Sequence, residues 1–518
     1  MLHGQRTRRI FKNFLDANEK KAYLGSELKT ILKNRYSELT DNNCRRIIKK
    51  AVDTNRINSS FPLVFEKNQY AYYSKKSNYD YRLFAEVIKK YKSALHRVIY
   101  ALERNGGILT FQEVQKISGA TSQETAHSVS FDSILKDLKV LNIVNEQEVD
   151  GIKFVIQNKS KSVCDDIHTY IQKLENKTLV LKLILNWLVR TNLIDSKQLC
   201  YVGEKNKYRG IERNGEVWDA WGFSNTVGIG KSERAFQTMV LVDCLEQNEY
   251  QEYDFQGFKQ RIDRVIFSTK NQHRKVLPIV IANKFSPAAR NLIKENCYLS
   301  YSISAILGEN AVMTVSEFNT YAKEIEDKIK RKERDIQYQI KESLNTINST
   351  GNRINYGNLV GKLFEYLMFP VLQEIYGKNA IITHSYKGKV SGKEFECDYL
   401  IETKDENIIV ELKGYKRDNV ILKGEFNSKT GKYAKNSILW FLDHNFKLCS
   451  EVLGRRKMNK FCYITTADIA ADAKTVLISK KKNKPLKLAC YYTYDTLIEL
   501  LNQYNLKEEK EIIQQFFV

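Results

Sequence analysis

The sequence contains few of the residues that mark disulfide scaffolds, zinc sites or membrane spans. It has 5 prolines in 518 residues, and its 9 cysteines are an odd number with no Cys-x-x-Cys pair. Neither a disulfide framework nor a zinc site is therefore predicted. The most apolar stretch, 178–189, is interrupted by Lys182 and Asn186, and arginines stand where a signal peptide would be apolar. We expect a soluble, cytoplasmic protein with no membrane partner.

The length and composition predict several folded domains. A chain of 518 residues exceeds one ordinary core and should form roughly three or four domains. Hydrophobic residues make up 42% and aromatic residues 11%, which excludes a disordered polymer.

The charge is strongly one-sided. Lys and Arg number 83 against 61 Asp and Glu, a formal net charge of +22. This excess favours a polyanionic partner, and nucleic acid is the first candidate. The alternative is a coding bias toward Lys, Asn, Ile and Tyr, in which the lysines only solvate the surface.

The N-terminus has the element order of a winged helix. Helices are predicted at 8–17, 26–34 and 41–55, followed by a strand pair around 63–65 and 70–73. The third helix can enter a major groove, where Asn and Arg contact base edges. Its alternative role is a solvated helix face. The candidate DNA-binding residues on this helix are Asn42, Asn43, Arg45, Arg46, Lys49 and Lys50.

A second unit of similar design is predicted over 82–156. Helices at 85–105, 110–118 and 123–141 precede a hairpin across 144–156, and Gly119 provides the turn of a helix-turn-helix. The candidate recognition segment has few basic residues, so a structural or dimerising role is as well supported as DNA contact. Its polar residues are Gln123, Glu124, Thr125, His127 and Ser128.

The C-terminal third begins with an amphipathic helix and a hairpin. Residues 357–372 are apolar at helical spacing, Glu365 lies near the apolar stripe, and Pro370 predicts the helix end. Two strands follow within 393–415. Between Asn319 and Asn352, a charged segment predicts a connecting helix, and the alternative is a short coiled coil.

The hairpin predicts a cluster of acids and a lysine. It brings Asp398 close to Glu411, and period-two alternation places Glu411 and Lys413 on one face. Asp398 and Glu411 supply hard oxygens for Mg²⁺, for which Mn²⁺ can substitute, assisted by the Leu412 carbonyl. Lys413 would orient the attacking water and offset phosphate charge. Glu365 would complete the acidic site.

These residues resemble the PD-(D/E)xK restriction-endonuclease-like superfamily. Twelve residues separate Asp398 from Glu411-Leu412-Lys413, with Cys397 where the pattern has proline. The resemblance implies a mixed sheet flanked by helices over about 356–494. It also implies hydrolysis of DNA phosphodiesters.

The middle of the chain predicts a mixed α/β domain that resembles a degenerate copy of the same fold. Asp219 and Asp243 follow the order of the C-terminal acids, but Leu245 stands at the lysine position. Lys259 or Arg261 could replace the missing charge. The alternative is an unrelated α/β domain with two ordinary acids.

The fold class is accordingly multidomain α/β, with N-terminal winged-helix units, a central α/β domain and a C-terminal restriction-endonuclease-like sheet. The predicted domains are 1–77 and 78–172 (winged helices), 173–320 (α/β), 321–352 (helical linker) and 353–518 (nuclease).

The predicted function is a Mg²⁺-dependent DNA endonuclease, such as a type II restriction enzyme or an anti-phage nuclease. Its expected partners are double-stranded DNA, a second copy of the chain for double-strand cleavage and a cognate methyltransferase. The alternatives are a transposition or recombination nuclease, and a DNA-binding regulator with an inert nuclease fold.

Overall fold

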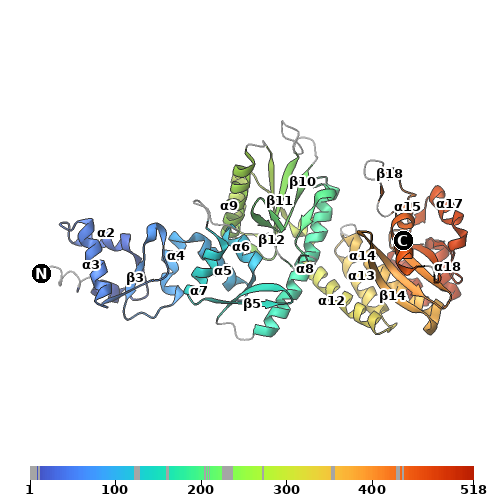
Figure 1. The fold of residues 1–518 in the computed structure, drawn as a ribbon, viewed down its shortest axis with the longest axis horizontal. Coiled ribbons are helices and arrows are strands. Elements are labelled where there is room, and N and C mark those ends of the chain that lie inside the picture. Colours follow the sequence, from blue (N-terminus) through green and yellow to red (C-terminus); the bar gives the residue numbers. More distant parts are fainter. Residues whose placement is uncertain are drawn as a thin grey trace. The chain divides into compact units, whose positions relative to one another are not determined.

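The computed structural model describes the chain except residues 1–8, 10–11, 122–128, 159–162, 204–205, 207, 209–210, 225–236, 271–273, 352–355, 428–431, 435–436 and 455. The chain divides into two compact units, Met1–Ile306 and Leu307–Val518. Both are mixed α/β and contain several small sheets (Figure 1). Among the described residues no helix is long and apolar enough to cross a membrane.

The N-terminal segment forms the predicted helices and a three-stranded sheet. Helices α2 (Gly25–Arg35) and α3 (Asp41–Asp53) lie in the chain between the first and second strands of a sheet whose order is β1 (Tyr23–Leu24), β3 (Ala71–Ser74), β2 (Ile57–Ser59). The Thr40 hydroxyl accepts a hydrogen bond from the Asn43 amide at 3.3 Å and caps α3. Buried Cys44, Ile48 and Ala51 hold α3 to the core.

One predicted strand of this segment was wrong. The strand expected around 63–65 lies earlier in the chain, at β2, which pairs with β3 through Ile57↔Ser74. Pro62 has no amide hydrogen and cannot donate to a strand ladder, so the pairing ends before it.

The second segment forms the predicted hairpin, but two of its predicted helices differ: the first is broken, and the described part of the third begins at Phe131 rather than within 123–130. The first predicted helix divides at Lys92 into α4 (Ala85–Tyr91) and α5 (Ser93–Arg104). The remaining elements are β4 (Ile108–Thr110), α6 (Phe111–Ser118), α7 (Phe131–Val140), β5 (Val144–Val149) and β6 (Ile152–Gln157). Gly119 ends α6 with φ 63°, a conformation that favours glycine. The candidate recognition residues 123–128 lie outside the described residues.

The central segment forms a five-stranded mixed sheet. Its order is β13 (Leu299–Ser302), β12 (Val276–Phe285), β11 (Thr238–Tyr250), β10 (Ala220–Ser224), β7 (Cys200–Tyr201). The flanking helices are α8 (Val163–Arg190), α9 (Glu252–Thr269) and α10 (Pro287–Glu295). The predicted strand–helix–strand order of β12, α10 and β13 is confirmed.

The segment predicted as one connecting helix forms two helices of the C-terminal unit. They are α12 (Ala311–Lys330) and α13 (Gln337–Ser349), and both pack against α14 (Gly357–Tyr376). The Glu326 carboxylate accepts a hydrogen bond from Tyr366 at 2.6 Å and pairs with Lys362 at 3.0 Å. These contacts attach α12 to α14.

Helix α14 does not end at Pro370, contrary to the sequence-based prediction. It continues to Tyr376, with Val371, Leu372 and Ile375 buried beyond the proline. Burial of these side chains outweighs the one backbone hydrogen bond that proline cannot make.

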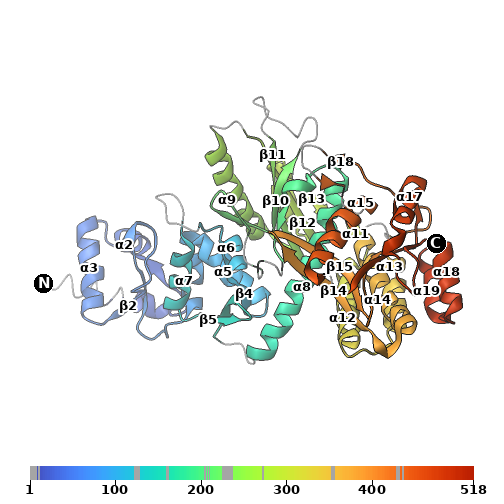
Figure 2. The ribbon, with the colours of Figure 1, turned by 45° about the vertical axis from the view of Figure 1, so that its right-hand side comes forward.

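The C-terminal sheet confirms the predicted mixed arrangement (Figure 2). Its order is β14 (Ile381–Val390), β15 (Lys393–Glu402), β16 (Glu406–Lys413), β20 (Met458–Thr465), β22 (Tyr491–Tyr492). The first three strands are antiparallel, and β20 and β22 run parallel to β16. The helices of this unit include α15 (Ile438–Trp440), the π-helical turn η8 (Phe441–Phe446), α16 (Lys447–Leu453), α17 (Ala471–Ser479), α18 (Tyr494–Gln503) and α19 (Lys507–Phe516).

Candidate functional site

The predicted acid pair lies where β15 and β16 separate. The two strands are in register through Tyr399↔Val410, and one step further stand Asp398 and Glu411. Asp398 turns its carboxylate between the strands, and Oδ2 accepts a hydrogen bond from the Leu412 amide at 2.6 Å. The Leu412 amide thus donates to a side-chain oxygen in place of a backbone carbonyl of the neighbouring strand. This hydrogen bond holds Asp398 beside Glu411.

Glu411 and Lys413 share one face of β16, as the alternation predicts. The Lys413 Nζ lies 2.8 Å from Glu411 Oε1. Asn445 of η8 donates a hydrogen bond to the other oxygen, Oε2, at 3.3 Å. Both oxygens of Glu411 therefore have partners that fix the rotamer of its side chain.

Asn445 was not found by sequence reasoning. It stands at the end of Asp443-His444-Asn445, which has no metal-ligand spacing. Its contact with Glu411 spans 34 residues of sequence, so no local spacing signals it.

Glu365 comes close to the pair because α14 packs tightly against the end of β16. A Cβ on Gly414 would lie 2.5 Å from the Cβ of Phe364, so glycine directly after the motif permits this approach. The Tyr399 hydroxyl donates to the Glu365 backbone carbonyl at 3.0 Å. Gly414, which directly follows the Glu411-Leu412-Lys413 motif, and Tyr399 of β15 thus position Glu365 of α14.

The carboxylates of the site repel one another. Burial, and then the charge of Glu411, raises the pKa of Asp398 well above its usual range, although Lys413 opposes the shift. Burial also raises the pKa of Glu365 to about 7, opposed by Lys413 and reinforced by Glu411. For Lys413, the attraction of Glu411 and Asp398 outweighs burial and raises its pKa. Additional positive charge would stabilise this cluster.

The donor set suits a hard cation with few protein ligands. Asp398 and Glu411 offer carboxylate oxygens, the donors that Mg²⁺ prefers, and Mg²⁺ commonly binds one or two carboxylates while keeping several waters. Within the described ranges, no group of three or more His, Cys, Asp or Glu is arranged to hold a metal ion. The Leu412 carbonyl as a further ligand stays a prediction.

The six candidate DNA-binding residues all lie exposed on α3. They are Asn42, Asn43, Arg45, Arg46, Lys49 and Lys50. The intervening Cys44 and Ile48 are buried. The helix therefore presents a basic, amide-bearing face to solvent.

The comparisons with known proteins yield distant likenesses. No family model matches the chain, and no curated protein matches it. A solved repair endonuclease from Pyrococcus abyssi aligns at 10% identity over 29% of this chain and 52% of its own, with a TM-score of 0.17. A complex of EndoMS with double-stranded DNA aligns at 8% identity over 31% and 63%, also with a TM-score of 0.17. The aligned parts cover less than two thirds of either protein, and likenesses this low carry no argument.

Proposed function

We propose that the chain is a Mg²⁺-dependent DNA endonuclease with its hydrolytic centre on β15 and β16. The observation that carries the proposal is the convergence of Asp398, Glu411 and Lys413. Asp398 is held by the Leu412 amide at 2.6 Å, and Lys413 contacts Glu411 at 2.8 Å. Two adjacent carboxylates and a lysine provide the charges that phosphodiester hydrolysis requires.

The acids and the lysine have separate roles. Asp398 and Glu411 would hold Mg²⁺, which supplies a Lewis acid and an activated water when bound. Lys413, with its raised pKa, stays protonated. Its Nζ is then a donor that orients the nucleophile and offsets charge on the phosphate. Glu365 completes the acidic site from α14, and Asn445 holds the Glu411 carboxylate.

Recognition of double-stranded DNA is assigned to the exposed face of α3. Arg45 and Arg46 offer forked donors that match guanine edges or phosphates, and Asn42 and Asn43 offer amides that match adenine. Lys49 and Lys50 add charge for the backbone.

The biological role that fits these parts is restriction or a related defence against foreign DNA. Recognition by α3 and cleavage at Glu411 would reside in different segments of the chain, as in modular restriction enzymes. One centre cuts one strand at a time, so a double-strand break requires a homodimer or two successive nicks. A cognate methyltransferase would protect the host DNA.

Cleavage of plasmid and phage DNA, methylated and unmethylated, tests the proposal. Wild-type protein should cut with Mg²⁺ or Mn²⁺ and not with EDTA. Lys413→Ala should lose rate on the order of a thousandfold, about 4 kcal/mol of transition-state stabilisation. Lys416→Ala, at an exposed lysine three residues later, is the matched control and should cut normally.

The same gels separate the alternatives. DNA that both wild-type and Lys413→Ala protein shift, but that neither cuts, would identify a DNA-binding regulator and overturn the nuclease. Cleavage confined to one branched junction, with linear duplex left intact, would favour a recombination enzyme.

A further inference from the structure

The central sheet repeats the construction of the C-terminal sheet. Its order β7-β10-β11-β12-β13 corresponds to β14-β15-β16-β20-β22. In both sheets the first three strands are antiparallel, and the last two run parallel to the third. The third strand, β11 or β16, therefore occupies the same position in each.

The repetition includes the acid pair. Strands β10 and β11 are in register through Ala220↔Val242, and one step further stand Asp219 and Asp243. Asp219 Oδ2 accepts a hydrogen bond from the Cys244 amide at 2.7 Å.

This geometry matches that of Asp398, whose Oδ2 accepts from the Leu412 amide at 2.6 Å. In both sheets the amide belongs to the residue directly after the second acid. Two residues after the second acid, Leu245 replaces Lys413.

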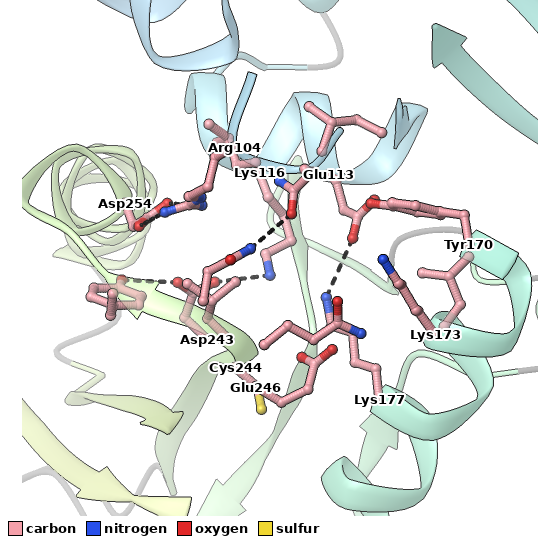
Figure 3. A pocket seen from close by; sticks show the side chains of 18 of the residues that line it. Arg104, Glu113, Lys116, Tyr170, Lys173, Lys177, Asp243, Cys244, Glu246 and Asp254 are labelled. Carbon is pink, nitrogen blue, oxygen red and sulfur yellow. Dashed lines mark hydrogen bonds and ion pairs between the residues drawn. The ribbon is translucent and has the colours of Figure 1, made fainter. Parts of the chain in front are cut away.

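Two cations from other elements lie against the central acids, and Figure 3 shows one of them, Lys116, beside Asp243. Lys116 of α6 contacts Asp219 Oδ2 and lies 3.1 Å from Asp243 Oδ1. Arg261 of α9 lies 3.1 Å from the same Asp243 oxygen. Of the two candidates for the missing charge, Arg261 therefore reaches the pair, whereas Lys259 is paired with Asp263 at 2.7 Å.

Both carboxylate oxygens of Asp243 have partners. The Tyr250 hydroxyl donates to its Oδ2 at 2.9 Å, and Oδ1 faces Lys116 and Arg261. At the C-terminal site, the helix residue that contacts the second acid, Glu411, is Asn445, whose side-chain amide is neutral. The central pair is thus balanced by three cations, Lys116, Arg261 and Lys177, whereas the C-terminal acids gather around Lys413.

One oxygen of the central pair has no hydrogen bond. Asp219 is fully buried, and within the described part of the chain its Oδ1 finds no hydrogen-bond donor. The Lys177 Nζ lies 3.8 Å from this oxygen, beyond hydrogen-bond distance. A buried carboxylate oxygen without a hydrogen-bond donor can serve as a ligand for a cation.

Helix α6 is held so that Lys116 stays in place. Arg97 donates to the Ile117 carbonyl at 2.9 Å, and Arg264 donates to the Gly119 carbonyl at 2.6 Å. Gly257 of α9 permits close packing, since a Cβ there would lie 2.6 Å from the Ile117 carbonyl oxygen.

We propose that Asp219 and Asp243 form a latent divalent-cation site, closed because the ammonium of Lys116 occupies the cation's position. The site accepts Mg²⁺ or Mn²⁺ once that charge is removed. Lys116 belongs to α6, and in the observed position of this helix its ammonium lies against both acids. A cation at this pair and the observed position of α6 therefore exclude each other. In its closed form the central sheet contributes no cation centre, so under the proposed function hydrolysis depends on the acids of the C-terminal sheet.

The test counts bound Mn²⁺ in the full chain with the C-terminal pair silenced by Asp398→Asn. In this background, unaltered Lys116 should leave the chain without tightly bound Mn²⁺, and Lys116→Met should bind one ion per chain. Adding Asp219→Asn should abolish that binding. Lys173→Met, at an exposed lysine of the same pocket, is the matched control and should bind none.

A folded Lys116→Met chain that binds no Mn²⁺ overturns the proposal, as does binding that persists with Asp219→Asn. If Lys116→Met melts without cooperativity, Mn²⁺ should restore a cooperative transition that the same concentration of KCl does not, and failure of that rescue also overturns it. Because the readout is binding, the result is independent of whether the chain cleaves DNA.

Discussion

The amide of Leu412 lies 2.6 Å from Oδ2 of Asp398, so the backbone of one strand holds the acid of its neighbour. The contact joins residues 14 positions apart and places Asp398 next to Glu411 at the end of the paired segment. The same hydrogen bond contributes to the stability of the hairpin and positions an acid of the proposed site. Substitutions of Asp398 can separate its effect on stability from its effect on activity.

Asp398→Asn and Asp398→Ala should differ in stability and agree in activity. An asparagine side chain retains an oxygen that can accept from the Leu412 amide, whereas alanine leaves this buried N–H unpaired, at a cost of about 1–3 kcal/mol. We expect the Ala variant to lose that much free energy of unfolding in urea and the Asn variant to lose less. Both should be inactive. Equal stability of the two would contradict the role of the hydrogen bond.

Asn445→Ala should weaken Mg²⁺ use without removing a catalytic group. Asn445 holds Oε2 of Glu411, so its loss frees the carboxylate to rotate. Loss of such outer partners typically lowers metal affinity about 10–100-fold. The Mg²⁺ concentration at half-maximal cleavage should therefore rise by that factor, with a smaller change in rate at saturating Mg²⁺. An unchanged Mg²⁺ requirement would show that Asn445 does not position Glu411.

His384 should make the C-terminal unit sensitive to acid. Burial, and then the charge of Lys362, lowers the pKa of His384 to about 4, against about 6.5 in an unfolded chain. The unfolded state therefore binds more protons between these values, and the free energy of unfolding falls as the pH decreases from 6.5 to 4. The expected loss from this group is about 3 kcal/mol.

His384→Phe isolates this contribution. The ring lies between Tyr366 and Tyr399, with centroids at 5.6 Å and 5.0 Å, so Phe can pack in its place. Urea unfolding from about pH 7 to about pH 4 should show a shallower loss of stability for the variant than for wild type. Parallel curves would exclude His384 as the titrating group.

Arg45→Ala and Arg46→Ala should each weaken DNA binding and lower its dependence on salt. Both side chains are exposed on α3. Loss of one phosphate contact should reduce the slope of log affinity against log salt by about 1. Lys20→Ala, exposed and outside α3, is the control and should leave the slope unchanged. Slopes equal to wild type in both Arg variants would place DNA recognition elsewhere.

The sequence by itself determined the local arrangement of the C-terminal site. Period-two alternation places Glu411 and Lys413 on one face of a strand whatever surrounds it, and their 2.8 Å contact follows from that geometry. The cap at Thr40 and the buried Cys44 and Ile48 likewise determined α3. These features depend on neighbours a few residues away.

Only the tertiary structure decided the rest, because the deciding contacts span long stretches of chain. Helix α14 passes through Pro370 since packing of the following residues outweighs a local helix-breaking preference. Asn445 reaches Glu411 across 34 positions, and Lys116 contacts Asp219 across 103. No spacing in the sequence encodes such pairs, because the approach of two helices to a sheet edge is set by how their apolar faces pack. That packing set Lys116 of α6 against the central acid pair and Asn445 of η8 against Glu411.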